Sequence, residues 1–314
     1  MKKILLGVGI LIVFIAIISF NRSFDKKKQI PKKDAIVSCS PLTDIDFITI
    51  EKITGIKGVA KNGEYKITIP QNDLDVVVDG FKIIPPMGLG TWIAFTPCDE
   101  GAMMMGDIVL TENDLAKVQS EVVKQGISIT AIHNHFVRNH PNILYMHIDA
   151  KDKVERLSYM AKSIIDKVKE VRGIDPRSAK ADSVTNTLNI AELDNIIGSK
   201  GEINKGVYKH TIGRPDVKLT EHGIPISTFL GFNTWIAWQG TMEKSAVCGD
   251  FTMKENEVQP VIKALIKSGI EIVALHNHMV EESPKVFFLH YWGTGKASNL
   301  ANGLHEALNV TNKL

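Results

Sequence analysis

The sequence contains one short motif twice, as Ala131-Ile132-His133-Asn134-His135 and as Ala274-Leu275-His276-Asn277-His278. The two copies lie 143 residues apart, and the same offset aligns residues 55–147 with residues 198–290 without a gap. Of the 93 aligned pairs, 33 are identical, which chance does not supply at one constant register. The chain is therefore an internal duplication.

Hydrophobic periodicity predicts that each copy combines strands with helices. In the first copy, the alternation from Tyr65 to Ile69 and again from Ile127 to His133 is typical of strands. Thr111 is the N-cap of a predicted helix that Gly126 ends. Because strands and helices do not alternate as βαβ units do, the sequence predicts the α+β class, as a tandem duplication of one domain made of an antiparallel sheet plus helices.

A polar stretch without periodicity, residues 174–188, predicts a linker. It separates a first repeat domain at residues 34–173 from a second at residues 189–314, and both follow an N-terminal segment at residues 1–33. We expect each repeat domain to contain its own core, because every strand and helix signal recurs at the same offset.

The N-terminal segment predicts a membrane anchor or an export signal. An uncharged apolar run from Ile4 to Phe20 is preceded by two lysines and followed by a basic flank that ends at Lys33. Ile18 and Phe20 are poor cleavage-site residues, which favours retention as an anchor. We expect the protein at the cell membrane with its repeats outside the cytoplasm, although the positive-inside rule applied to the basic flank indicates the opposite orientation.

A second feature near the N-terminus leaves the processing of this segment open. Ile36-Val37-Ser38-Cys39 is similar to a bacterial lipobox, but the apolar run ends well before Cys39. This spacing favours a free or structural cysteine at Cys39, and cleavage with lipidation at Cys39 is the alternative.

The charge distribution limits the partners. The formal net charge is only +2, and much of the basic excess lies in the N-terminal segment. Without a broad cationic surface for a phosphate backbone, nucleic acid is not an expected partner. The expected partners are the membrane, through the N-terminal segment, and an unidentified small-molecule or envelope ligand.

The histidines of the two motifs predict metal binding. Residues two apart on a strand point to the same face, so each His-x-His pair can face one cavity, and a third histidine follows after eleven residues. Three converging imidazoles with an open fourth position are typical of catalytic zinc sites. The alternative is that the histidines only fix the loop after each strand by hydrogen bonds. The predicted zinc ligands are His133, His135 and His147 in the first copy, and His276, His278 and His290 in the second.

Other residues near the motifs are candidates for supporting roles. Glu281 and Glu282 follow the second motif and are the predicted catalytic carboxylates, with solvated turn residues as the alternative. Asp107 and Asp250, each after a glycine, are interpreted as turn residues or as hydrogen-bond acceptors for ligand histidines. The apolar surroundings of Trp92 and Trp235 favour core positions.

The second copy carries a family resemblance. Ala274-Leu275-His276-Asn277-His278-Met279, Pro284 and Phe287-Phe288-Leu289-His290-Tyr291-Trp292-Gly293 resemble the signature of the LppY/LpqO family of bacterial lipoproteins, and the duplication matches over nearly the whole chain after the N-terminal segment. That family is built on a domain of unknown function, so the resemblance implies export and duplication but no reaction. The first copy departs from the signature at Ile148-Asp149-Ala150.

Two functional hypotheses follow from the sequence. One is an envelope-located, zinc-dependent hydrolase in which His276, His278 and His290 hold the metal and Glu281 or Glu282 assists the water. The other is a non-catalytic envelope protein whose duplicated pockets bind a ligand or act as a scaffold.

Overall fold

The computed structural model describes residues 42–99 and 101–311. The predicted N-terminal segment, Cys39 and the predicted start of the first repeat domain lie outside these residues. Within them, no helix is both long and apolar enough to cross a membrane. The described residues belong to one compact unit.

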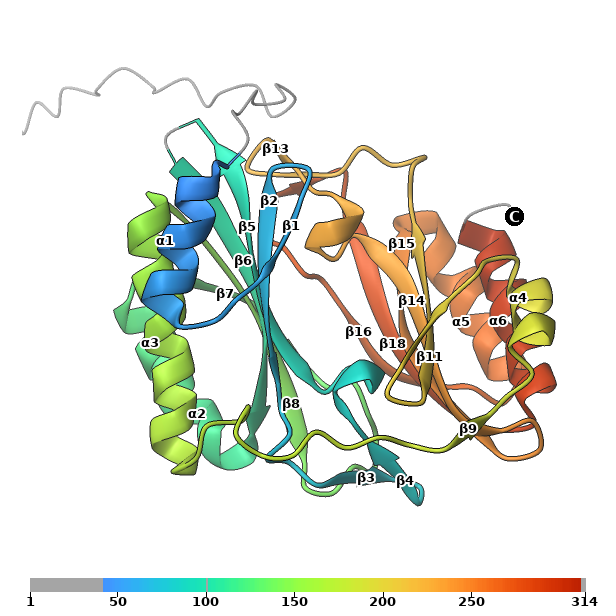
Figure 1. Ribbon diagram of the computed structural model, residues 1–314. Coiled ribbons are helices and arrows are strands. Elements are labelled where there is room, and N and C mark those ends of the chain that lie inside the picture. Colours follow the sequence, from blue (N-terminus) through green and yellow to red (C-terminus); the bar gives the residue numbers. More distant parts are fainter. Residues whose placement is uncertain (1–41, 100, 312–314) are drawn as a thin grey trace, which may run out of the picture. The chain divides into compact units, whose positions relative to one another are not determined.

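The first repeat forms a six-stranded antiparallel sheet in the order β1-β2-β5-β6-β8-β7, covered on one face by three helices (Figure 1). β3 and β4 pair separately as a small hairpin. The elements are α1 (Asp44–Thr54), β1 (Val59–Lys61), β2 (Glu64–Pro70), β3 (Val76–Val78), β4 (Phe81–Ile83), η1 (Pro85–Met87), β5 (Gly90–Cys98), β6 (Gly101–Thr111), α2 (Glu112–Lys124), β7 (Ser128–His133), β8 (Ile143–Asp152) and α3 (Val154–Arg172).

The second repeat has the same plan, with the strand order β10-β11-β14-β15-β18-β16 and the short β9 parallel to β14. β12, β13 and β17 form a separate three-stranded sheet. The elements are β9 (Asn186–Thr187), α4 (Ile190–Ile197), β10 (Glu202–Asn204), β11 (Val207–Gly213), β12 (Thr220–Glu221), β13 (Ile224–Pro225), η2 (Thr228–Leu230), β14 (Asn233–Thr241), β15 (Ser245–Lys254), η3 (Glu255–Glu257), α5 (Val258–Lys267), β16 (Glu271–His276), β17 (Glu282–Ser283), β18 (Val286–Gly295) and α6 (Ala297–Thr311).

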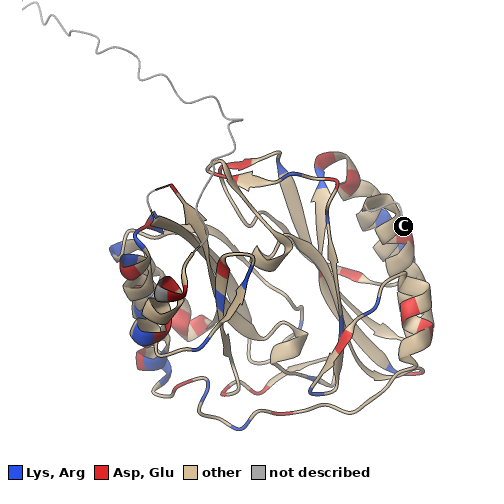
Figure 2. Cartoon of the chain, turned by 45° about the horizontal axis from the view of Figure 1, so that its top comes forward, with Lys and Arg blue, Asp and Glu red and all other residues tan. Residues whose placement is uncertain are grey.

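The predicted α+β duplication with antiparallel sheets is confirmed, and its local signals explain the elements. Thr111 caps α2 in a reciprocal capping box with Asp114, as the pattern of a hydroxyl followed by an acid predicts. Charged residues gather on the helices and connecting loops, whereas most strand segments are uncharged (Figure 2). This distribution is expected of sheets that are covered on both faces.

The period of two along each strand sorts side chains between two apolar layers. In β8, Met146 and Ile148 belong to a core under α1, α2 and α3, whereas Tyr145 belongs to a different core on the opposite face. In β18, Leu289 and Tyr291 pack in the same way against α4, α5 and α6. Each repeat therefore has one core of its own between its sheet and its helices.

The opposite faces of the two sheets pack against each other, so the repeats also share a core. Val109 and Tyr145 of the first repeat lie in one cluster with Ala237 and Trp292 of the second. A further cluster joins residues of β5 and β6 with residues of β12 to β18. The expectation of separate cores holds only for the helix-covered faces. The layers are helices, sheet, sheet and helices (Figure 1).

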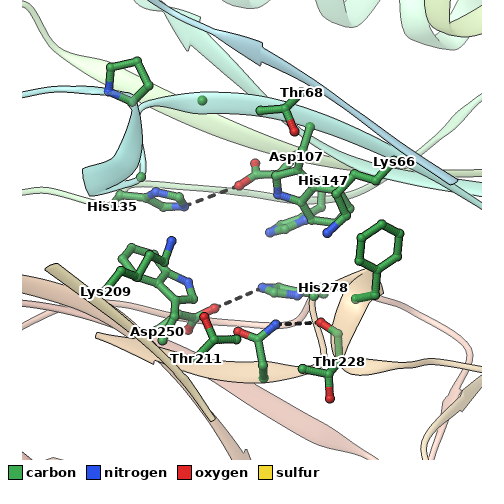
Figure 3. Close-up of a pocket in the computed structure, with 18 of the residues that line it drawn as sticks. Lys66, Thr68, Asp107, His135, His147, Lys209, Thr211, Thr228, Asp250 and His278 are labelled. Atoms are coloured by element: carbon green, nitrogen blue, oxygen red, sulfur yellow. Dashed lines mark hydrogen bonds and ion pairs between the residues drawn. The ribbon is translucent and has the colours of Figure 1, made fainter. Parts of the chain in front are cut away.

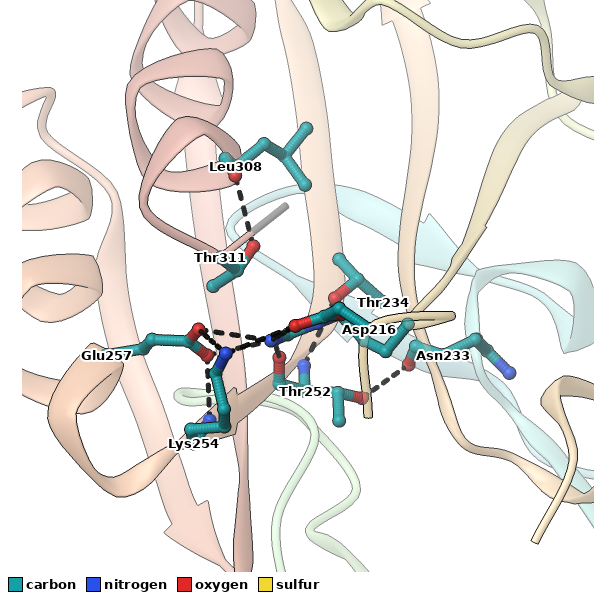
Figure 4. A network of polar contacts seen from close by, with 9 residues as sticks. Asp216, Asn233, Thr234, Thr252, Lys254, Glu257, Leu308 and Thr311 are labelled. Atoms are coloured by element: carbon teal, nitrogen blue, oxygen red, sulfur yellow. Dashed lines mark hydrogen bonds and ion pairs between the residues drawn. The ribbon is translucent and has the colours of Figure 1, made fainter. Parts of the chain in front are cut away.

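A buried arginine joins the segment after β11 to β15 and η3 of the second repeat, and Figure 4 shows its partners Asp216, Thr252 and Glu257. Arg214, with a side chain 1% exposed, donates to both carboxylate oxygens of Glu257 at 2.9 and 3.0 Å and to the carbonyl oxygen of Thr252 at 2.8 Å. It also pairs with Asp216, to which Lys254 donates at 3.1 Å. Paired and hydrogen-bonded in this way, the charge is tolerated in the interior.

Candidate functional site: a histidine cluster under a pocket

The six predicted histidines meet in one cluster between the sheets. His133 and His276 end the strands β7 and β16, and His135 and His278 lie in the loops that follow. The closest pairs of histidine rings each join one repeat with the other, with centroid separations of 3.8, 3.9 and 4.0 Å. These pairs are His133 with His276, His135 with His290, and His147 with His278.

The nitrogen atoms of these rings form sets that could hold a metal, and two of the sets mix the repeats. In each set, one ligand atom per residue lies within 4.8 Å of the others. The sequence predicted one triad in each copy, whereas the structure brings both triads together at the contact between the copies. The sets are His133, His276 and His290; His147, His276 and His278; and Asp107, His133 and His147.

Several ring nitrogens are buried without a hydrogen-bond partner among the described residues. Both nitrogens of His133 and of His276 are of this kind, as are Nε2 of His147 and Nε2 of His290. His290 Nδ1 lies 3.0 Å from the carbonyl oxygen of Gly249, so Nδ1 carries the proton and Nε2 has a free lone pair. Buried polar atoms normally have a partner, and an imidazole lone pair fixed in this way is suited to a metal ion.

Burial keeps these histidines neutral near pH 7. It lowers the pKa of His147 to about 3, with neighbouring histidines adding to the effect and Asp107 opposing it. Burial also lowers the pKa of His133, His276 and His278. Only the neutral imidazole binds a metal, so the environment favours the binding form.

Asp107 and Asp250 lie beside the cluster in matching positions. Each aspartate lies beside the second histidine of a His-x-His pair. Asp107 Oδ2 is 3.5 Å from His135 Nε2, and Asp250 Oδ2 is 3.4 Å from His278 Nε2. The prediction of turns here is wrong, because both residues lie within strands and pair with His147 and His290 across the ladder. Their position is that of carboxylates that orient histidine ligands.

A pocket of about 410 Å³ opens over the cluster between the two sheets (Figure 3). Its lining follows the internal duplication, because residues 143 apart face each other across it. The loops around η1 and η2 form its rim. The identical pairs are Lys66 and Lys209, Thr68 and Thr211, Gly88 and Gly231, Trp92 and Trp235, Asp107 and Asp250, His135 and His278, and His147 and His290.

The two lysines make the pocket cationic. Lys66 Nζ lies 4.7 Å from the ring centroid of Trp92, and Lys209 Nζ lies 4.0 Å from that of Trp235. Among the described residues, neither ammonium group has a carboxylate within ion-pair distance. Burial lowers the pKa of each lysine to about 8, so both remain largely charged at neutral pH. Trp92 and Trp235 are partly buried, pack against the shared cores and also line the pocket, so the prediction of core positions holds only in part.

The structure does not bring the predicted catalytic glutamates to this pocket. Glu282 is 2% exposed and accepts a hydrogen bond from Asn277 Nδ2 at 3.2 Å. The side chain of Glu281 is 68% exposed and lies 3.3 Å from His222 Nδ1. Neither lines the pocket, where the carboxylates are Asp107 and Asp250.

The pocket lysines were missed by the sequence analysis, although a signal was present. Lys66 and Lys209 are identical across the repeat, as are Thr68 and Thr211, and each lies between two buried residues of its strand. A polar residue that is kept at the same strand position in both copies indicates a function for that face of the sheet.

Comparison with known proteins places the fold and site in a family. The chain belongs to the family described as Domain of Unknown Function (DUF1259), whose model matches it twice, at residues 48–167 and 191–310. No curated protein sequence matches the chain significantly.

Two solved structures have weak similarity to the chain. The trimeric bacterial microcompartment shell protein PduB is 11% identical, with 83% of this chain and 92% of that chain covered and a TM-score of 0.21. EtuB from Clostridium kluyveri is 8% identical, with 83% and 91% covered and a TM-score of 0.20. At such scores the similarity supports no statement about function.

Proposed function

We propose that the protein is a metal-dependent hydrolase whose zinc centre is built jointly by the two repeats. The observation that carries this proposal is the set of partnerless nitrogens on His133, His276, His147 and His290 beneath a pocket. Zinc bound by imidazoles lowers the pKa of a coordinated water to about 7 and so supplies a hydroxide nucleophile.

The substrate is a small molecule that carries an anionic group. Support comes from Lys66 and Lys209, which face the pocket without a carboxylate partner among the described residues. Such ammonium groups form charge-assisted hydrogen bonds with carboxylates or phosphates. Trp92 and Trp235 offer flat apolar walls for the rest of the ligand.

Asp107 and Asp250 take the roles that the sequence assigned to Glu281 and Glu282. Each is within reach of a cluster histidine and lines the pocket. In this position they orient His135 and His278 and accept protons at the pocket.

The location proposed for this enzyme is the cell membrane, with the repeats outside the cytoplasm. This proposal rests on the apolar run from Ile4 to Phe20 and on the resemblance to the LppY/LpqO family. Fractionation of cells that express the full chain tests it, and recovery of the full chain in the soluble cytoplasmic fraction would contradict it.

Metal analysis tests the proposed centre. The full chain, purified without a His tag and dialysed against zinc and then against metal-free buffer, should retain at least one zinc ion per chain. The double substitution His133→Asn with His276→Asn removes a member of each of the three sets in the histidine cluster and should release the zinc bound there. His305→Gln on α6, outside the cluster, is the matched control and should retain it. Retention of far less than one zinc ion by the wild type would end the metal proposal.

A second candidate is a non-catalytic protein that binds an anionic envelope ligand. The distance of Glu281 and Glu282 from the pocket favours it, because the predicted catalytic carboxylates are absent from the lining. Turnover separates the two candidates. Zinc-loaded protein should hydrolyse some members of a panel of anionic esters and amides, and the His133→Asn with His276→Asn variant should hydrolyse none.

A further inference from the structure

A second group of possible metal ligands lies apart from the pocket, where β8 of the first repeat meets β12 of the second. His222 Nε2 is 3.3 Å from Asp149 Oδ1 and 3.7 Å from Glu221 Oε1. One ligand atom from each of the three residues lies within 4.8 Å of the others. None of them lines the pocket.

The carboxylates of this group are buried and incompletely partnered. Asp149 is 5% exposed and Glu221 is 1% exposed. Among the described residues, Asp149 Oδ2 and Glu221 Oε2 have no hydrogen-bond partner. An ionised carboxylate is costly to bury unless a cation or hydrogen bonds compensate it. A single imidazole at His222 supplies at most one positive charge to this group.

The equivalent corner of the first repeat, around Asp79 and Arg138, shows which positive charge the His222 corner lacks. The offset of 143 residues makes Asp79 the equivalent of His222 and Arg138 the equivalent of Glu281. Arg138 donates to both oxygens of Asp79 at 2.9 and 2.8 Å and also to Glu271. In that corner a guanidinium neutralises the acids, whereas in the His222 corner the same position holds another carboxylate.

In another network, the first repeat has glutamine at the position equivalent to Arg214, and an arginine from a different element takes its place. The buried Glu257 and the exposed Asp216 are paired by Arg214, and their equivalents Asp114 and Asp73 are paired by Arg172 from a different element. For Asp149 and Glu221, the structure provides no arginine or lysine within ion-pair distance among its described residues.

We propose that Asp149, Glu221 and His222 bind one divalent transition-metal ion, such as zinc or manganese, at the junction of the two repeats. The donor set of one imidazole and two carboxylates suits these ions. His222 Nδ1 faces Glu281 Oε2 at 3.3 Å, which leaves Nε2 for the metal and gives Glu281 the role of the carboxylate that orients the ligand. The ion ties β8 to the β12 hairpin.

Counting metal in a variant without the histidine cluster tests this site separately from the proposed function. In the His133→Asn with His276→Asn background, the full chain should still bind one zinc ion per chain when zinc alone is titrated. Adding Asp149→Asn with His222→Gln should abolish that binding. Asp79→Asn, at the equivalent position of the other corner, is the matched control and should leave it unchanged.

Two outcomes would overturn the proposal: no zinc bound in the background variant, or zinc binding that survives Asp149→Asn with His222→Gln. In the first case His222 and the acids form an ion-paired group without metal. If the background variant does not fold, His222→Gln in the wild type should lower the zinc count by one. A failure of the histidine-cluster proposal would give a different result. The wild type would then bind one zinc ion, which His222→Gln would remove and His133→Asn would not.

Discussion

In each repeat an arginine pairs with a buried acid, but the arginine stands at a different position of the repeat. In the second repeat, Arg214, which follows β11, pairs with Glu257 and donates to the carbonyl oxygen of Thr252. In the first, position 71 is glutamine, and Arg172 at the end of α3 pairs with Asp114 and donates to the carbonyl oxygen of Val109. The guanidinium occupies the same place in both networks although it comes from different elements.

The pocket lining differs from these networks because it keeps residue identity as well as position. Lys66, Asp107 and His147 each face an identical residue 143 positions later. A buried acid is satisfied by a cation from any element, since charge pairing is what the interior requires. A pocket that binds a ligand or metal needs a particular side chain at a particular place. The contrast therefore separates structural from functional positions.

Removing either buried arginine should have the largest effect on stability. Arg172→Ala leaves Asp73 and Asp114 without their arginine, and Arg214→Ala leaves buried Glu257 with only the partly exposed Lys254 as a cation, so each should lower the free energy of unfolding by up to about 3–5 kcal/mol. Chemical denaturation measures this loss. Arg156→Ala, which breaks an ion pair with a side chain 61% exposed, should cost no more than about 1 kcal/mol.

The equivalence of the two networks has its own test. Gln71→Arg combined with Arg172→Ala transfers the arrangement of the second repeat to the first and should recover part of the stability lost in Arg172→Ala. No recovery, together with a loss under about 1 kcal/mol for Arg214→Ala, would show that the two networks are not equivalent supports of the fold.

Loss of a pocket lysine should have the next largest effect, on ligand binding. Lys66→Met or Lys209→Met removes a charged donor worth about 1.5–3 kcal/mol, so the affinity for inorganic phosphate should fall by roughly tenfold or more. Isothermal titration calorimetry measures the change. Lys244→Met is the matched control, because Lys244 also lies over an aromatic ring, Phe81, but outside the pocket. Equal affinity in all four proteins would contradict an anion site.

Acidification of the metal-free protein should have the smallest effect over any single pH unit. Burial lowers the pKa of His147 from 6.5 to about 3, so the unfolded state takes up a proton that the folded state does not. The stability that neutral His147 contributes is present above pH 6.5 and is lost as the pH falls toward 3. Below pH 6.5, the free energy of unfolding of the wild type should therefore decline more steeply than that of His147→Gln. The difference in slope should be about 1.4 kcal/mol per pH unit.

His222 serves as the control for this pH profile, because its pKa is shifted in the opposite direction from that of His147. The hydrogen bond to Asp149 raises the pKa of His222, so in metal-free protein its contribution is present below its unfolded pKa and is lost as the pH rises through the folded value. His222→Gln should not flatten the acid decline. A His147→Gln profile parallel to that of the wild type would contradict the burial argument.

Much of the fold could be predicted from the sequence because its signals are local. Alternation along Tyr65 to Ile69 and the cap at Thr111 each depend on neighbouring residues, and both elements formed as expected. The face-to-face packing of the sheets could not be read in this way. It depends on contacts such as Tyr145 with Trp292 in one shared core, which neither repeat contains alone.

The site shows the same division. The six histidines were found because they recur at one offset, and strand alternation placed His133 and His135 together. Their union in one cluster required the packing of β7 near β16. Arg172 and His222 were not singled out, since neither has an identical residue 143 positions away and their partners come from elements distant in the sequence.

The central claim is that the two repeats build one metal centre together. Anomalous diffraction at the zinc absorption edge, from crystals of the zinc-loaded protein, tests it most directly. The expected result is a zinc peak bonded at about 2.0–2.1 Å to imidazole nitrogens from both repeats, with His276 together with His133 or His147 among the ligands. Zinc held by the three histidines of a single repeat, or no zinc peak at the histidine cluster, would contradict the claim.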